Sequence, residues 1–168
     1  MVISTIQRLV RHLLMTPWQV RRAFSRGTLD TIKEEIAASE RLHAGQIRFA
    51  VEGALPIAKL LNQQSTRGRA LEVFSLLRVW DTEHNNGVLI YVLLAVRVVE
   101  IIADRGIHSR VNEREWISIC EAMEARFQIG NFEAGAVEGI RSTTQLLAGH
   151  FPPTSGRRNE LPDRPVVW

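Results

Sequence analysis

The stretch that decides the fold is WDTEHNNGVLIYVLLAVRVVEIIADRG, residues 80–106. Its centre, residues 88–95, is an apolar run that is too short to cross a membrane and too continuous for a strand exposed on one face. Such a run predicts a strand covered on both sides, as in a layered α/β domain. Residues 98–103 form a second strand pattern so close behind it that the two must pair antiparallel.

The residues before this stretch predict a parallel neighbour. Residues 46–52 alternate polar and apolar side chains, and the outward-facing Arg48 and Glu52 favour a strand nearer the sheet edge than residues 88–95. Residues 53–65 are interpreted as a variable crossover that leads into a helical pattern from Thr66. A strand, a crossover with a helix and a second strand make a βαβ unit, in which the two strands run parallel.

Two helices, residues 112–127 and 132–151, are predicted after the hairpin. The fold class is therefore α/β, a three-layer α/β/α sandwich with a small mixed β-sheet (the βαβ unit plus the antiparallel hairpin) and two C-terminal helices. We expect three segments along the chain. They are a basic amphipathic arm (residues 1–27), an α/β domain (28–151) and a Pro-rich flexible tail (152–168).

Positive charge is concentrated at the start of the chain. The net charge is only +3, yet residues 1–26 contain five arginines and no acidic residue, and residues 3–15 have the spacing of an amphipathic helix. One interpretation is an interfacial anchor that places apolar side chains and arginines among lipid headgroups. The other is an arm that packs on the domain or on a second subunit. The predicted membrane or partner contacts are Arg8, Arg11, Trp18, Arg21 and Arg22.

Several classes of protein are excluded or disfavoured. The single cysteine, Cys120, allows no intrachain disulfide, and no apolar run is long enough for a transmembrane helix. Arginines interrupt the apolar positions of residues 1–26, which is unlike a cleavable signal. The basic residues show no nucleic-acid reading motif, so nucleic acid is not an expected partner. We therefore expect a cytoplasmic protein, with peripheral binding at the inner membrane left open.

Polar side chains cluster where the central strand begins and its antiparallel neighbour ends. These two ends lie at the same edge of the sheet, so carboxylates and amides there are expected to converge. Oxygen ligands suit calcium or magnesium. The predicted cation ligands are Asp81, Glu83, Asn85, Asn86 and Asp104. Arg105 is the predicted phosphate or anion contact.

The same residues also have an ordinary structural interpretation. Asp81 caps a turn, Asn86-Gly87 supplies special backbone angles, and Asp104 and Arg105 form surface pairs. His43, His84 and His108 are within reach of the edge, but their spacing is not that of a zinc site. No phosphate-cradling glycine loop or serine nucleophile motif occurs in the sequence.

Four segments, in this order along the chain, together resemble the TPM-domain family, in particular its short bacterial members without a transmembrane segment. They are residues 39–52, 79–91, 102–107 and 130–135. The resemblance covers roughly residues 28–151 and implies a three-layer α/β domain with a small mixed sheet. It departs from the family at Ala95-Val96-Arg97, where related members read Ala-Asp-Arg. If that aspartate helps to bind a cation, its replacement by Val96 implies poor binding here.

The family's functions are diverse. The family that the chain resembles includes a plant thylakoid-lumen acid phosphatase, bacterial members that bind calcium or magnesium, a receptor-associated animal protein and members described only as membrane proteins. A shared fold does not transfer any of these activities. The favoured hypothesis is an accessory or interaction domain of undefined activity that acts at a membrane surface or on a protein partner. The alternative is a divalent-cation-dependent phosphatase, and the sequence leaves open whether the protein is an enzyme.

Overall fold

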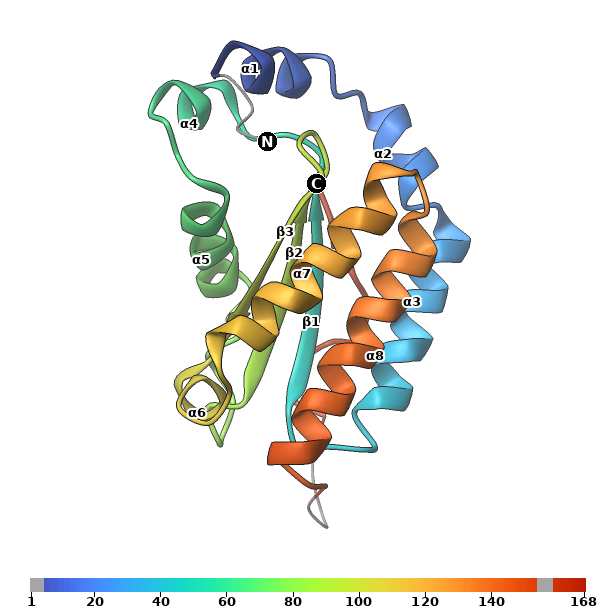
Figure 1. Ribbon diagram of the computed structural model, residues 1–168, viewed down its shortest axis with the longest axis vertical. Coiled ribbons are helices and arrows are strands. Elements are labelled where there is room, and N and C mark those ends of the chain that lie inside the picture. Colours follow the sequence, from blue (N-terminus) through green and yellow to red (C-terminus); the bar gives the residue numbers. More distant parts are fainter. Residues whose placement is uncertain (1–4, 154–158) are drawn as a thin grey trace.

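A four-stranded mixed sheet, in the order β3-β2-β1-β4, forms the central layer of the computed structural model, which describes residues 5–153 and 159–168 (Figure 1). The strands are β1 (Gln46–Glu52), β2 (Gly87–Leu93), β3 (Val98–Ala103) and β4 (Val166–Val167). β1 and β2 are parallel, with Phe49 opposite Ile90, and β2 and β3 are antiparallel, with Ile90 opposite Ile101. The predicted βαβ unit and hairpin are confirmed.

Helices cover both faces of the sheet, as the three-layer prediction requires (Figure 1). The helices are α1 (Thr5–Leu13), α2 (Pro17–Ala23), α3 (Arg26–Ser39), α4 (Ile57–Leu61), α5 (Thr66–Leu76), α6 (Arg105–His108), α7 (Glu113–Gln128) and α8 (Phe132–His150). The first helix was predicted to begin at residue 3, and residues 3 and 4 lie outside the described residues.

Alternate residues of the strands separate two apolar cores. Ile47, Phe49 and Val51 of β1 face the larger core under α3, α7 and α8, whereas Leu89 and Tyr91 of β2 face a smaller core under α5. This division follows from the two-residue period of a strand, which sends neighbouring side chains to opposite faces. β2 is buried along its whole length, as its uninterrupted apolar sequence predicted.

The prediction that β1 lies nearer the sheet edge than β2 is wrong, because each of the two strands lies one strand from an edge. Residues 166–167 of the predicted tail form β4. β4 pairs in parallel with β1 through Ala50↔Val166 and Val51↔Val167, which makes β1 an internal strand with every residue buried. The Arg48 guanidinium donates to the carbonyl oxygens of Pro162 and Arg164, the latter at 2.7 Å. These bonds give the buried cation and the tail backbone their polar partners. Residues 154–158 of the predicted tail lie outside the described residues.

The basic arm is not separated from the domain at residue 27. Phe24, directly after α2, is 2% exposed and lies in the larger core with its ring centroid 6.2 Å from that of Phe49 and 6.1 Å from that of Phe127. Val20 of α2 is buried in the same core. Ser25 caps α3 by accepting a hydrogen bond from the Thr28 N–H. Residues 17–27 are thus an integral part of the fold.

α1 is held by one buried histidine. The imidazole of His12 is 4% exposed, and its Nδ1 accepts a hydrogen bond of 3.0 Å from the Leu55 N–H. An unprotonated Nδ1 is required for this bond, so the imidazole is neutral when α1 is seated. Burial, together with the charge of Arg8, lowers the pKa of His12 to about 4.

We expect the seating of α1 to weaken in acid. The folded-state pKa of His12 is lowered, so the unfolded chain binds more protons between about pH 6.5 and 4 and stability falls as the pH falls through this range. The loss is at most about 3 kcal/mol. Denaturant unfolding of the wild type and of His12→Gln at a series of pH values checks this. The stability difference between the two proteins should shrink in acid, and a difference that stays constant contradicts it.

Gly135 and Gly139 let α8 approach α7 closely. A Cβ at Gly135 would lie 2.7 Å from Cε1 of Phe127 and 2.8 Å from Cβ of Arg126, whereas a Cβ at Gly149 of the same helix would have no atom within 4 Å. We expect Gly135→Ala to lower the free energy of unfolding by roughly 1–2 kcal/mol, because overpacking exceeds the gain in helix propensity. The matched control Gly149→Ala should be neutral or slightly stabilising. Equal stabilisation by both changes, in denaturant unfolding, would refute the close approach.

Candidate functional site: an apolar and basic tip

The polar residues predicted to bind a cation lie in the loop before β2 and directly after β3, and the carboxylates of Asp81 and Asp104 have contacts within the protein. Asp81 is exposed and forms an ion pair of 2.5 Å with Arg78. Glu83 is exposed, and its backbone N–H donates to the Glu160 carboxylate of the tail at 2.9 Å. The exposure of Asp81 and its ion pair with Arg78 fit the interpretation of Asp81 as a turn residue.

The amides of the edge also have structural contacts. The Asn85 side-chain oxygen accepts two hydrogen bonds of 3.1 Å from the Arg105 guanidinium, so Arg105 is tied to the loop. The Asn86 side chain is buried and donates to the Ala44 carbonyl at 2.6 Å, which joins the loop to the start of β1. Asp104 caps α6 by accepting from the Arg105 N–H at 2.7 Å.

Two oxygen atoms at this edge are buried without a hydrogen-bond partner among the described residues, Oδ1 of Asn86 and Oδ2 of Asp104. Of the three histidines predicted to be near the edge, His43 is buried and His84 and His108 are exposed. Within residues 5–153 and 159–168, no group of three or more His, Cys, Asp or Glu side chains is placed to hold a metal ion. Cation binding by the predicted ligands and phosphatase chemistry stay predictions from sequence.

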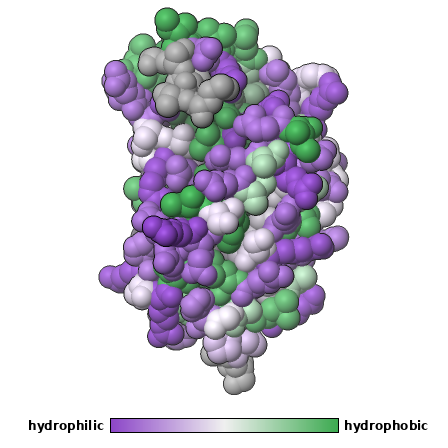
Figure 2. All heavy atoms as spheres, viewed as in Figure 1, coloured by the Kyte–Doolittle hydropathy of each residue, from purple (hydrophilic) through white to green (hydrophobic). Residues whose placement is uncertain are grey.

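A different surface stands out at the opposite end of the molecule. Large apolar side chains of α1, α4 and the residue after α1 are exposed there, and Figure 2 shows hydrophobic side chains gathered at this end. We call these residues the tip: Ile6, Val10, Leu13, Leu14, Ile57 and Leu61. Leu14 is 67% exposed and Leu61 70% exposed, so the apolar face of α1 does not pack on its own domain. The apolar face of α1 therefore does not cover its own domain, and contact of the arm with a membrane or a second subunit stays a prediction.

The tip is attached to the sheet by a buried polar network. Glu52, at the end of β1, accepts two hydrogen bonds of 2.8 and 3.0 Å from the Arg69 guanidinium and one of 2.6 Å from the Tyr91 hydroxyl. Arg69 also pairs with Glu72, which pairs in turn with Lys59 of α4 at 2.6 Å. The hydrogen bonds from Lys59 and then Arg69 lower the pKa of Glu72 to about 2. The charges of the network thus have the partners that burial demands.

This network also reaches α1. The Arg8 guanidinium donates to the Gln64 carbonyl at 2.5 Å, and His12 accepts from Leu55 as described above. Both contacts hold α1 beside α4, next to the ends of β1 and β2 (Figure 1). The sequence did not indicate the roles of His12 or Glu52. The alternation of β1 placed Glu52 on an outward face, and its partner Arg69 lies on a different element.

The remaining predicted contact residues are exposed close to the tip. Arg11 of α1 and Trp18, Arg21 and Arg22 of α2 are all exposed, and the Arg22 guanidinium lies 5.3 Å from the ring centroid of Trp18. Arg8 alone is partly buried through its bond to Gln64. The arrangement combines an apolar end with arginines beside it, which suits contact with an anionic, partly apolar surface.

Comparison with known proteins is consistent with the fold. The TPM domain family model matches residues 20–146. The NMR structure of the BA42 protein from the psychrophilic bacterium Bizionia argentinensis is similar, with a TM-score of 0.75 and 30% sequence identity over 86% of this chain and 94% of that one. No curated protein matches the chain. The family model covers most of the chain, and with the similarity to BA42 it shows that the chain belongs to the TPM-domain family.

Proposed function

We propose that this TPM-domain protein is a peripheral membrane-binding accessory domain that docks on an anionic lipid surface through its tip. The single observation that carries the proposal is the exposed apolar face of α1 and α4, held in place by buried polar contacts. Exposed apolar side chains gathered at one end of a molecule mark interaction surfaces, because burying them on contact is favourable. The described residues contain no helix long and apolar enough to cross a bilayer, so insertion would be limited to the interface.

The charges around the tip favour lipid over a generic protein surface. The first acidic residue of the chain is Asp30, so all five arginines of residues 1–26 act without local compensation by neighbours in sequence. Each arginine near an anionic leaflet contributes about 1 kcal/mol of attraction, which adds to the apolar insertion of the tip. A neutral apolar partner surface would gain nothing from this field. An acidic protein partner is the competing occupant, and the experiment below separates the two.

Preorganisation strengthens the case for docking as the role of α1. A free amphipathic helix of this length is marginal in water and must fold when it binds. Here His12, Arg8 and the network around Glu52 already hold α1 and α4 side by side. The apolar side chains therefore meet the bilayer as one surface, and binding does not have to offset the entropy of ordering the helix.

We expect the protein to sediment with vesicles of phosphatidylglycerol and phosphatidylcholine, and less with phosphatidylcholine alone or at high salt. Leu14→Glu and Leu61→Glu should each weaken partitioning roughly tenfold, because each change removes an inserting side chain and adds a negative charge. The matched control is Leu76→Glu at the end of α5, where the leucine is 66% exposed but lies away from the tip (Figure 1).

Three outcomes of this experiment are decisive. Loss of binding in the two tip variants with unchanged binding in Leu76→Glu supports membrane docking. Absence of sedimentation with anionic vesicles contradicts it and leaves an acidic protein partner as the occupant of the tip. Equal effects of all three substitutions also contradict it, because they would show a nonspecific response to added negative charge.

A further inference from the structure

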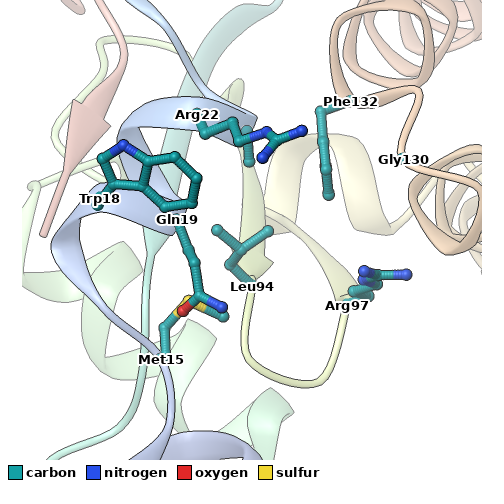
Figure 3. A pocket seen from close by; sticks show the side chains of 9 residues that line it. Met15, Trp18, Gln19, Arg22, Leu94, Arg97, Gly130 and Phe132 are labelled. Atoms are coloured by element: carbon teal, nitrogen blue, oxygen red, sulfur yellow. The ribbon is translucent and has the colours of Figure 1, made fainter.

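Two adjoining cavities lie between the arm and the turn that joins β2 to β3. One, of about 420 Å³, is lined by α2, the hairpin and the turn between α7 and α8 (Figure 3). The other, of about 330 Å³, is lined by the end of α1, the hairpin and Gln128. Met15, Gln19, Leu94 and Arg97 line both cavities, so together they form one groove. We call it the arm groove. Its size is typical of small-ligand sites.

The arm groove is strongly basic. Arg11, Arg22 and Arg97 line it, and its lining contains no acidic residue. No carboxylate of the described residues pairs with any of these arginines. Charges of one sign in a cleft with apolar walls concentrate ions of the opposite sign. The charge of the groove therefore matches an anion.

Two of the arginines are positioned before any ligand arrives. The Arg22 guanidinium is stacked beside the Trp18 ring and points into the groove toward Phe132 (Figure 3). Arg97 donates to the Gln128 carbonyl at 2.8 Å and lies 5.9 Å from the ring centroid of Phe132. Arg97 also has a φ of 54°, a left-handed conformation that costs energy for an arginine and often marks functional turns. Arginines held in this way lose little freedom when they bind an anion.

The walls between the arginines are apolar and aromatic. Met15, Leu94 and the ring of Phe132 form them, and the groove is open at Gly130 (Figure 3). A small inorganic anion would leave these walls uncovered. The lining thus fits an anion joined to an apolar group, for which guanidinium forks supply bidentate hydrogen bonds and the walls supply contact area. Two of the elements that line the groove, α2 and the turn between β2 and β3, lie at the same end of the molecule as α1 and α4 (Figure 1).

We propose that the arm groove binds the phosphate of an anionic phospholipid headgroup, with the adjoining glycerol and first acyl carbons against its apolar walls. This inference rests on the proposed membrane docking, which brings the groove to headgroup level. Arg97 and Arg22 bind the phosphate, and Arg11 adds to the field at the open side. The groove gives the domain a preference for anionic lipid that an apolar tip alone does not have.

The test uses short-chain phosphatidylglycerol as a soluble monomer, titrated into the full-length isotope-labelled protein and followed by NMR. We expect saturable shifts of the Gly130 amide and the Trp18 indole N–H. Arg97→Gln should weaken the affinity at least tenfold and Arg22→Gln severalfold. The matched control is Arg110→Gln, whose guanidinium lies 5.3 Å from the Phe151 ring centroid in an arrangement like that of Arg22 over Trp18. Its affinity should equal that of the wild type.

Further titrations identify the source of the anion. Inorganic phosphate and glycerol phosphate should bind much more weakly than the short-chain lipid, because they leave the apolar walls uncovered. Short-chain phosphatidylcholine should also bind weakly, since its choline cation offsets the phosphate charge. Equal binding of inorganic phosphate and lipid overturns the lipid assignment. Shifts that map outside the groove, or unchanged affinity in both Arg22→Gln and Arg97→Gln, overturn the site.

Failure of this inference is distinguishable from failure of membrane docking. Leu61→Glu at the tip, outside the lining of the groove, should leave monomer binding intact while it weakens vesicle binding. If vesicles bind and monomers cause no shift in the groove, the groove assignment is wrong and docking stands. If monomers bind in the groove and vesicles are not bound, docking is wrong and the groove is a site for a soluble amphiphilic anion, which overturns its role in membrane selection.

Discussion

The insertion of Phe24 into the main core is the constraint on which the functional surfaces depend. Its ring packs among Phe49, Phe127 and Phe132, which come from β1, α7 and α8. This contact fixes α2 against the sheet and so places Trp18 and Arg22 opposite the hairpin, which creates the arm groove. It also sets the direction in which the chain leaves toward α1. Without it, the basic segment would be a tether with no defined surface.

α1 itself is placed by polar rather than apolar contacts. Its buried face offers His12 to the Leu55 amide, and Arg8 bonds to the Gln64 carbonyl. Ile6, Val10 and Leu13 remain exposed to solvent. This reverses the usual arrangement of an amphipathic helix, which turns its apolar stripe to its own core. An apolar face of α1 that is exposed to solvent fits a helix that binds another surface. The network around Glu52 then supplies the rigid base on which α1 and α4 form one surface.

Local sequence patterns predicted the strands that form the sheet. The features that the sequence analysis missed depend on contacts between residues that are far apart in the sequence. The apolar run of residues 88–95 and the alternation of residues 46–52 are properties of a few neighbouring residues, so the βαβ unit and hairpin were readable. The role of Arg48 could not be predicted in this way, because its partners Pro162 and Arg164 lie at the far end of the chain. The convergence of Asp81 and Asp104 at one edge followed from topology. Whether they share a ligand depends on side-chain contacts that topology does not determine, such as the ion pair of Asp81 with Arg78. Val96, where the resemblance implies an aspartate, is buried in the smaller core.

The central claim is that α1 and α4 form a preassembled surface that enters the lipid interface. The most direct test is NMR of the full-length protein bound to anionic bicelles that contain a spin-labelled lipid, which broadens the signals of nearby amides. The account predicts broadening at residues 6–14 and 57–61 and little effect on α6 and the first turns of α7, at the other end of the molecule (Figure 1). Broadening centred on α6 or spread evenly over the surface would contradict it.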